Sequence, residues 1–349
     1  MVKRLLAGTV TLIVLAFLVI VISVVRFDVP REQLVGKYAG GASQFATLPS
    51  GASAHVRDEG NADGPVLVLI HGSNASLHTW EPWVAELGGT YRIVSMDLPG
   101  HGLTGRVPGD DYSREAMAAF VIEIMDALDI DRFAVGGNSM GGGVSAMIAL
   151  ENPERVSALL LVNSAGIPVE RDANDVPLAF RLAGMPVISK VMRYVLPRSV
   201  VEEGLKKVFV DQSKVTDDMV ARYLDLALHE GNRDATRIRF SQNAARDEAA
   251  FAARLGEISM PTLIMWGDQD GLIPVAAAHE FKARIPHAEL VIYENVGHVP
   301  MEEVPEESAA AVAAFLAGAL APAAGAPAPA EEAPAEAAEE EVGEEAGAE

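Results

Sequence analysis

Six short apolar runs, each closed by a turn signal, constrain the fold of this chain more than any other feature. They are PVLVLIHG (65–72), YRIVSMDLPG (91–100), RFAVGGNS (132–139), ALLLVNSAG (158–166), PTLIMWGDQD (261–270) and AELVIYENVGH (288–298). Continuous apolar runs of this length are typical of strands buried on both faces. Helical patterns separate them, for example SREAMAAFVIEIMDAL (113–128) and GGVSAMIALENP (142–153). The alternation predicts an α/β protein with a mostly parallel central sheet covered by helices on both faces.

One stretch interrupts this alternation. Residues 167–258 carry helical patterns but no strong strand, so they form an insertion between two strands of the sheet. Because open α/β sheets bind ligands at the carboxyl ends of their strands, we expect a helical cap over that edge. The alternative is a helical decoration remote from the site. The core would then comprise residues 51–166 and 259–320, with 31–50 as a linker leading into it.

The N-terminus has the pattern of a membrane segment. Lys3 and Arg4 precede a run without charged residues from 5 to 25, and Arg26 follows it. A helix of that length spans a bilayer. We therefore predict that residues 1–30 form an uncleaved single-pass anchor, with the body of the chain on the extracytoplasmic side because positive charge precedes the span. A cleaved signal peptide and a buried core helix are the alternatives, although ISVVRFDVP offers no small-x-small cleavage site.

Composition excludes several kinds of partner and site. Residues 321–349 contain Ala, Pro, Gly and Glu with almost no other residue type, which predicts a disordered acidic tail. The net charge of −22 argues against nucleic acid as a partner. The absence of cysteine excludes disulfides, thiolate chemistry and cysteine-based zinc sites. No cluster in the body has metal-ligand spacing, so we expect no metal, and the oligomeric state stays open.

The stretch GGNSMGG (136–142) sets Ser139 between a strand pattern and a helix pattern. A sharp strand–turn–helix holds a serine in a strained conformation with its Oγ exposed, and Gly137, Gly141 and Gly142 would let backbone and helix approach closely. A serine hydroxyl is a weak nucleophile, so it requires a base, and the base requires an orienting acid.

Residues downstream can supply both groups. In this architecture the chain order is serine, then acid, then histidine. His298 follows the last strand in NVGHVPMEE, where it could reach the serine, whereas His229 lies in the insertion. The loop WGDQDGLIP offers Asp268 and Asp270; the deeper Asp270 is the predicted acid, and Asp268 is interpreted as a turn residue.

An oxyanion requires backbone N–H donors. Met140, directly after the nucleophile, supplies one, and Ser73 in LIHGSNAS is the best candidate for the other. We expect Trp80 and His71 mainly to pack in the core and to shape the loop. The candidate residues of a substrate pocket are His71, Gly72, Asn74, Trp80, Asn138 and Val299.

Five motifs occur in a fixed order: HGSNASLHTW, DLPGHGLTG, GGNSMGGG, WGDQDGLIP and GHVPMEEVPE. Together they resemble the α/β-hydrolase superfamily, in particular its capped branch of esterases, lipases, non-haem haloperoxidases and carbon–carbon bond hydrolases. The resemblance covers about residues 50–320. It implies Ser139, Asp270 and His298 as a catalytic triad, and Ser73 and Met140 as the oxyanion hole. It also implies a helical cap over an apolar pocket and no cofactor.

The motifs also reduce the number of reaction classes that we expect for this chain. Dehalogenases and most epoxide hydrolases of this superfamily carry an aspartate at the elbow, where this chain has Ser139. Hydrolases of meta-cleavage products carry a glycine- and proline-rich loop and a tryptophan after the histidine, where this chain has HGSNAS and GHVP. We therefore expect a membrane-anchored serine hydrolase that cleaves lipophilic or small acyl esters, similar in layout to bitopic monoacylglycerol lipases. A carbon–carbon bond hydrolase and a non-catalytic ligand-binding protein are the alternatives.

Overall fold

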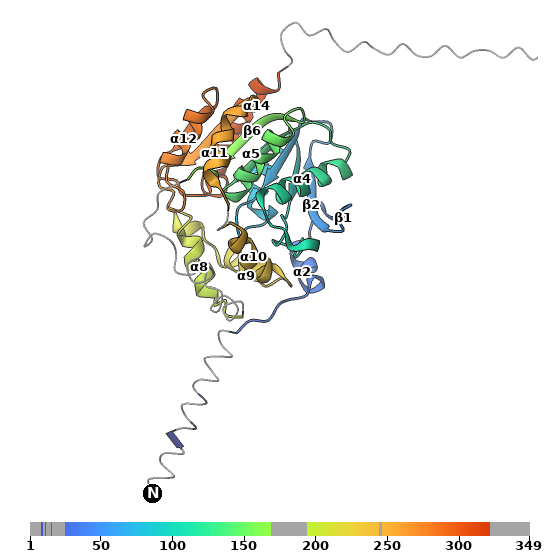
Figure 1. Ribbon diagram of the computed structural model, residues 1–349. Helices are drawn as coiled ribbons and strands as arrows, with labels where there is room; N and C mark the ends of the chain where they lie inside the picture. The colour runs from blue at the N-terminus through green and yellow to red at the C-terminus, as the bar shows by residue number, and fades with distance from the viewer. Residues whose placement is uncertain are drawn as a thin grey trace, which may run out of the picture.

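An eight-stranded sheet forms the centre of the protein in a computed structural model, which describes residues 8, 9, 11, 15, 25–168, 194–243 and 246–321 (Figure 1). The strand order is β1-β2-β4-β3-β5-β6-β7-β8, and only β1 and β2 run antiparallel to their neighbours. The strands are β1 (Ser43–Thr47), β2 (Ser53–Gly60), β3 (Val66–Ile70), β4 (Arg92–Met96), β5 (Phe133–Asn138), β6 (Val156–Val162), β7 (Thr262–Gly267) and β8 (Glu289–Tyr293). The predicted α/β architecture with a mostly parallel sheet is confirmed.

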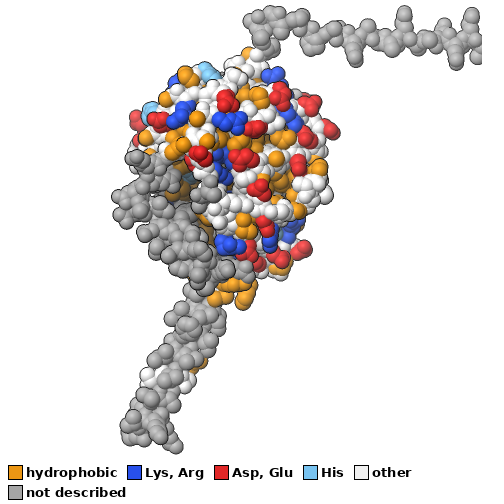
Figure 2. Space-filling view, in the orientation of Figure 1, with side chains coloured by type: hydrophobic (Ala, Val, Ile, Leu, Met, Phe, Trp, Pro, Cys, Tyr) orange, Lys and Arg blue, Asp and Glu red, His pale blue; other side chains and the backbone are white. Residues whose placement is uncertain are grey.

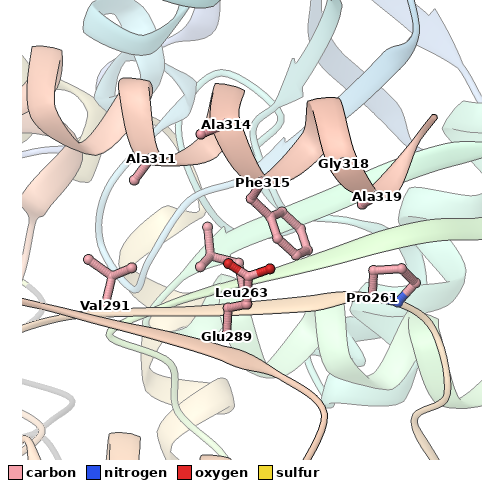
Figure 3. Close-up of a pocket in the computed structure, with 9 residues that line it drawn as sticks. All are labelled: Pro261, Leu263, Glu289, Val291, Ala311, Ala314, Phe315, Gly318 and Ala319. Atoms are coloured by element: carbon pink, nitrogen blue, oxygen red, sulfur yellow. The ribbon is translucent and has the colours of Figure 1, made fainter.

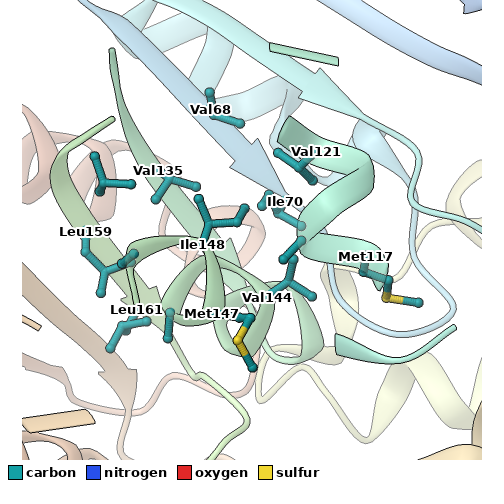
Figure 4. Close-up of a cluster of buried hydrophobic side chains, with 14 of the residues drawn as sticks. Val68, Ile70, Met117, Val121, Val135, Val144, Met147, Ile148, Leu159 and Leu161 are labelled. Atoms are coloured by element: carbon teal, nitrogen blue, oxygen red, sulfur yellow. The ribbon is translucent and has the colours of Figure 1, made fainter. Parts of the chain in front are cut away.

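Helices cover both faces of the sheet because successive strand residues point to opposite sides. In β3, Val68 and Ile70 join one core cluster, and Leu67 and Leu69 join the other. The first cluster (Figure 4) packs against α4 (Arg114–Ala127), α5 (Met140–Glu151), α11 (Glu248–Arg254) and α12 (Ala276–Arg284). The second packs against α3 (Glu81–Leu87) and α14 (Pro305–Ala319). Both sides of the central strands are therefore apolar, as the runs in the sequence predict.

The described residues between β6 and β7 form helices and no strand. They comprise α8 (Arg198–Lys206), η3 (Gln212–Lys214), α9 (Asp217–Ala227), α10 (Asn232–Asn243), α11 and η4 (Leu255–Glu257). Phe251 of α11 and Leu255 of η4 belong to the first core cluster, so this end of the predicted cap packs on the sheet. Helices α8, α9 and α10 lie side by side at one end of the body in Figure 1, and Ala235 of α10 belongs to the first core cluster as well.

The predicted linker, residues 31–50, contains regular structure. Helix α2 (Arg31–Tyr38) and the edge strand β1 occupy most of it. Leu34 and Tyr38 pack with Leu103 and with Leu226 of α9, and the Tyr38 hydroxyl donates to Asp225 at 2.7 Å. The sequence does not predict this helix, because only two of its eight residues are buried. This stretch therefore joins the insertion to the sheet.

The predicted membrane anchor needs correction. In the part of the chain that the structure describes, no helix has both the length and the apolar character needed to cross a membrane. A transmembrane helix requires about 20 predominantly apolar residues. The single-pass N-terminal anchor and the membrane localisation built on it are therefore not supported. Of residues 1–24 only 8, 9, 11 and 15 are described, so most of the predicted span lies outside the described residues.

The surface of the body carries charges of both signs. Figure 2 shows acidic and basic side chains interspersed over the face in view. Several charged side chains pair, as Arg92 does with Asp58 at 2.7 Å and Arg155 with Asp126 at 2.6 Å.

The remaining helical turns are η1 (Leu77–Trp80), η2 (Pro108–Asp110) and α13 (Pro300–Glu303). The predicted acidic tail, 321–349, lies outside the described residues apart from its first residue.

Candidate active site

Ser139 lies at a sharp turn between β5 and α5, with φ 55° and ψ −119°. A positive φ is strained for a serine and costs on the order of 1–3 kcal/mol. Neighbouring strands hold it: the Ser139 N–H donates to the Val162 carbonyl at 3.0 Å, and the Ala165 N–H donates to the Ser139 carbonyl at 2.8 Å. A side chain at Gly141 would collide with the Ile70 carbonyl, so only glycine fits there. The turn thus presents the serine at the carboxyl edge of the sheet.

Asp270 and His298 meet in the loops that follow β7 and β8. The Nδ1 of His298 lies 2.7 Å from Oδ2 of Asp270, and both side chains are buried. Oδ1 of Asp270 accepts from the N–H groups of Leu272 at 2.7 Å and Ile273 at 3.0 Å. Burial tends to raise the pKa of Asp270, but the charge of His298 and these hydrogen bonds outweigh it and lower the pKa. The ionised carboxylate therefore orients the imidazole.

Two asparagines hold this pair in place. Asn163 follows β6 and donates from Nδ2 to Oδ2 of Asp270 at 2.8 Å. Asn138, next to Ser139, donates from Nδ2 to the carbonyl of His298 at 2.9 Å. The backbone of the predicted nucleophile and that of the predicted base are thus joined through one side chain. Among the described residues, no hydrogen bond involves Ser139 Oγ; such contacts are often long in enzymes without substrate.

Glu303 fixes the loop that carries His298, a role that the sequence analysis does not identify. Its Oε2 accepts from the Gly297 N–H at 2.7 Å, and its Oε1 accepts from the N–H groups of Val210 and Asp211 at 2.8 and 2.7 Å. The carboxyl is 3% exposed. Its only signal in the sequence is its place in GHVPMEEVPE. It connects the histidine loop to the insertion.

Two backbone N–H groups beside Ser139 are available to an oxyanion. Within the described chain, neither Ser73 nor Met140 uses its N–H in a hydrogen bond, and Met140 is the first residue of α5. The loop of Ser73 runs beside the predicted nucleophile, Ser139. A methyl group at Gly72 would lie 2.9 Å from Oδ1 of Asn138 and 3.2 Å from Cβ of Ser139.

The other pocket candidates have mainly structural surroundings. His71 is fully buried, donates from Nδ1 to the Gly72 carbonyl at 2.7 Å and accepts the Leu98 N–H at 3.0 Å, so it shapes the loop. Trp80 and Val299 are buried in the second core cluster. The structure places both in the hydrophobic core, where aromatic and β-branched side chains pack behind the site.

Elsewhere in the structure a serine, a histidine and an aspartate form a chain of hydrogen bonds. Nδ1 of His55 lies 2.7 Å from Oδ2 of Asp97, and Nε2 of His55 lies 3.0 Å from the Ser43 hydroxyl. Asp97 also accepts the N–H groups of Leu77 and Leu103, each at 2.8 Å. Burial tends to raise the pKa of Asp97. The hydrogen bond with His55 and the charge of that histidine outweigh burial and lower the pKa of Asp97. Ser43 lies in the regular edge strand β1, and Asp97 binds the backbone of two loops, so this network stabilises turns.

A groove of about 490 Å³ lies on the opposite edge of the sheet (Figure 3). Pro261 and Glu289 in its lining stand at the amino ends of β7 and β8, and Phe315 of α14 covers it. Asp270 and His298 follow the carboxyl ends of the same strands. The groove is therefore separate from the candidate active site. No three His, Asp or Glu side chains of the described residues form a group that could hold a metal ion.

A carboxyl group near the site holds its proton at unusually high pH. Glu302, four residues after His298, accepts the Thr79 hydroxyl at 2.7 Å. Burial raises its pKa to about 7, and the Thr79 hydrogen bond and the charge of Arg222 only partly oppose this effect. Folding therefore favours the protonated form of Glu302.

This shift predicts a pH dependence of stability. Between about pH 4.5 and 7 the unfolded chain releases the Glu302 proton before the folded protein does, so the free energy of unfolding falls as pH rises through this window. In Glu302→Gln that decline should be smaller. Urea unfolding at pH 5 and pH 8 measures it, with Glu306→Gln on the exposed face of α14 as the control. Equal declines in the wild type and Glu302→Gln would contradict the prediction.

Comparisons with known proteins agree with this architecture. The family model of the alpha/beta hydrolase fold matches residues 65–305. A 2-hydroxy-6-oxononadienedioate/2-hydroxy-6-oxononatrienedioate hydrolase of Cupriavidus pinatubonensis is 31% identical over 272 residues, 74% of this chain and 89% of that protein. Lipase 1 of Psychrobacter immobilis is 28% identical over 267 residues, 74% of this chain and 78% of that protein.

Solved structures share the fold. A bacterial membrane phospholipase A has a TM-score of 0.66 and 27% identity, and the match covers 92% of this chain and 100% of that one. A meta-cleavage product hydrolase from Pseudomonas fluorescens has a TM-score of 0.67 and 24% identity over 79% of this chain and 98% of that one. The matched family model, the strand order and the serine turn lead to one assignment: the chain belongs to the α/β-hydrolase family.

Proposed function

We propose that the protein is a serine hydrolase that cleaves carboxylic esters through an acyl-enzyme intermediate. One observation carries the proposal: the buried Asp270–His298 pair lies at the same sheet edge as the strained turn of Ser139. The free N–H groups of Ser73 and Met140 beside that turn support it. A nucleophile, a base with its orienting acid and oxyanion donors are the components of acyl transfer.

Acylation would follow from these roles. Oγ of Ser139 attacks the ester carbonyl carbon and gives its proton to Nε2 of His298. The carbonyl oxygen becomes an oxyanion that accepts from the N–H groups of Ser73 and Met140. When the tetrahedral intermediate collapses, the C–O bond to the alcohol breaks and His298 returns the proton to the departing oxygen. Asp270 holds the Nδ1–H and stabilises the imidazolium.

Deacylation repeats the sequence with water. His298 takes a proton from a water molecule, whose oxygen attacks the acyl carbon. The second tetrahedral intermediate releases Ser139 Oγ, which regains its proton from His298, and the free acid leaves. The enzyme returns to its starting state with one ester and one water converted to one acid and one alcohol.

The insertion is proposed to cap the site. Arg239 of α10 donates to the Ser73 hydroxyl at 2.8 Å, so one helix of the insertion reaches the oxyanion loop. Two similar proteins are named a lipase and a phospholipase A, which supports an ester substrate with a lipophilic or small acyl group.

A second candidate is a carbon–carbon bond hydrolase. The relative named 2-hydroxy-6-oxononadienedioate/2-hydroxy-6-oxononatrienedioate hydrolase, at 31% identity, favours it. The same serine, histidine and oxyanion donors could act on a ketone carbonyl. The HGSNAS loop and the GHVP segment depart from the motifs of that group, and this leaves ester hydrolysis as the first proposal.

Active-site labelling tests the proposal. A fluorophosphonate probe should modify the protein at one serine, and peptide mass spectrometry should place the adduct on Ser139. A panel of short 4-nitrophenyl esters, long-chain monoacylglycerols, lactones and vinylogous diketones then separates the two candidates. Turnover of the diketones alone would favour the second candidate. A protein that neither reacts with the probe nor turns over the panel would contradict both.

A further inference from the structure

Arg239 of α10 lies against both residues of the proposed oxyanion hole. Its Nη2 donates to the Ser73 hydroxyl at 2.8 Å and lies 3.4 Å from Oδ1 of Asn74. Its Nη1 lies 3.3 Å from the sulfur of Met140. The guanidinium therefore stands beside the position that the scissile carbonyl would occupy.

This cation is buried without an acidic partner. The side chain is 3% exposed, and its Nε–H has no hydrogen-bond acceptor. The other two buried arginines of the described chain each pair with a carboxylate, Arg57 with Glu81 at 2.8 Å and Arg114 with Glu248 at 2.7 Å. Among the described residues, no carboxylate forms an ion pair with Arg239.

The surroundings of Arg239 disfavour its charge. Burial, and then the charge of Arg246, lower its pKa to about 10, and it nevertheless stays ionised at neutral pH. Burying an ion without a counter-ion is costly, which makes such a site favourable for an incoming anion. Sites of this kind occur where a protein binds a charged ligand.

A second unpartnered polar atom belongs to the same neighbourhood. His101 is buried, its Nδ1 donates to the Pro99 carbonyl at 2.9 Å, and its Nε2 has no partner. Burial, and then the charge of Arg239, lower the pKa of His101 well below its usual value. An anion at Arg239 would offset part of that effect. Because Nδ1 carries the proton, Nε2 of His101 is an acceptor and requires a donor from a ligand, so the anion itself would bind Arg239 alone.

We propose that Arg239 binds an anionic oxygen group of the substrate, a carboxylate or a phosphate, next to the oxyanion hole. This inference rests on the proposed function, because it places the anion on the ester that Ser139 attacks. The planar guanidinium suits both groups, since it can donate two parallel hydrogen bonds. The preferred substrates would then be esters that carry a negative charge close to the scissile bond.

Matched pairs of esters test the proposal and locate the charge. Mono-4-nitrophenyl adipate and 4-nitrophenyl hexanoate differ by a carboxylate on the acyl side. A 1-hexanoylglycerol 3-phosphate and 1-hexanoylglycerol differ by a phosphate on the alcohol side. In Arg239→Met, kcat/KM should fall at least about tenfold for the anionic member of one pair and less than about threefold for its neutral partner. Arg239→Lys should retain part of the preference.

Controls separate charge recognition from other roles. Arg237→Met alters the same helix at a half-exposed arginine that pairs with Asp234. It should leave the ratio of kcat/KM between the anionic and the neutral ester unchanged in both pairs. Thermal unfolding checks that each variant folds. An equal loss of kcat/KM on the anionic and the neutral ester of each pair would mean that Arg239 stabilises the oxyanion itself, and it would overturn the proposal. The proposal would also be overturned if Arg239→Met left the ratio of kcat/KM between the two esters unchanged in both pairs.

A binding measurement keeps the inference independent of turnover. Calorimetry with the full-length Ser139→Ala protein should detect binding of adipate or inorganic phosphate, and Ser139→Ala/Arg239→Met should abolish it. If Ser139 resists the fluorophosphonate but the anion still binds through Arg239, the proposed function fails and the anion site stands. If neither anion binds to Ser139→Ala, the anion site is refuted even when ester hydrolysis is observed.

Discussion

Ser139→Ala is expected to lower kcat for ester hydrolysis by about 10⁴- to 10⁶-fold, because it removes the Oγ proposed to form the acyl-enzyme. The residual rate would come from the oxyanion donors, which remain in place. The turn itself should persist, since its hydrogen bonds use the backbone N–H and carbonyl of Ser139. Single-turnover kinetics on the best ester of the panel measure the loss, and the fluorophosphonate adduct should disappear with it.

The chain supplies a matched control for this substitution. Ser43 lies 3.0 Å from Nε2 of His55, which is bound to Asp97, so by side-chain contacts alone it resembles a catalytic serine. It lies in the regular strand β1 and no helix begins after it, so it lacks the oxyanion donors that a helix N-terminus provides. Ser43→Ala should therefore keep activity within about threefold of the wild type. A large loss in Ser43→Ala with full activity in Ser139→Ala would move the nucleophile to β1.

Local patterns in the sequence were sufficient for most of the fold. Parallel strands buried on both faces are continuously apolar, so β3, β5, β6 and β7 stand out without any knowledge of their neighbours. The carboxyl ends of these strands meet at one edge, which is why Asp270 and His298 could be paired across 28 residues.

Residues that act through long-range contacts could not be predicted in the same way. Asn163 binds Asp270 across 107 residues, and Glu303 binds the backbone of Val210 across 93. Neither has a local pattern, because an amide or a carboxylate after a strand is also a common turn residue. Arg239 lies in a helix whose charged residues would suit a solvent-facing surface, and only its burial in the structure distinguishes it.

The N-terminal prediction failed for a related reason. The prediction rested on hydropathy along residues 5–25, and no helix in the described part of the chain is long and apolar enough to cross a membrane. Residues 25–38 contact the insertion: the Val29 N–H donates to the Leu228 carbonyl at 2.7 Å, and Arg233 pairs with Asp28. Such contacts leave no periodic signal in the sequence.

Asp270→Asn is expected to lower kcat by about 10⁴-fold while leaving the fold intact. Oδ1 of Asp270 accepts two backbone N–H groups, so the amide oxygen of the introduced asparagine must take that place. The NH2 group of that side chain then faces Nδ1 of His298, which must become an acceptor. The imidazole proton moves to Nε2, the atom that should receive the serine proton, and general-base catalysis is lost.

The neighbouring Asp268 provides the control for this last substitution. It is exposed, and its Oδ1 lies 3.4 Å from the Val296 N–H, so Asp268→Asn should change kcat less than about threefold. Both variants should unfold near the wild-type temperature. The asparagine introduced by Asp270→Asn keeps the two backbone hydrogen bonds, and the Asn163 amide, which donates to Oδ2 in the wild type, must turn its unpartnered Oδ1 toward the new NH2 group. The kcat of each variant across pH 6 to 9, a range in which the carboxylate of Asp270 stays ionised, distinguishes tautomer loss from a shifted pKa. A tautomer effect persists at every pH, whereas recovery of Asp270→Asn to near wild-type kcat at high pH would mean that the carboxylate acts by charge alone.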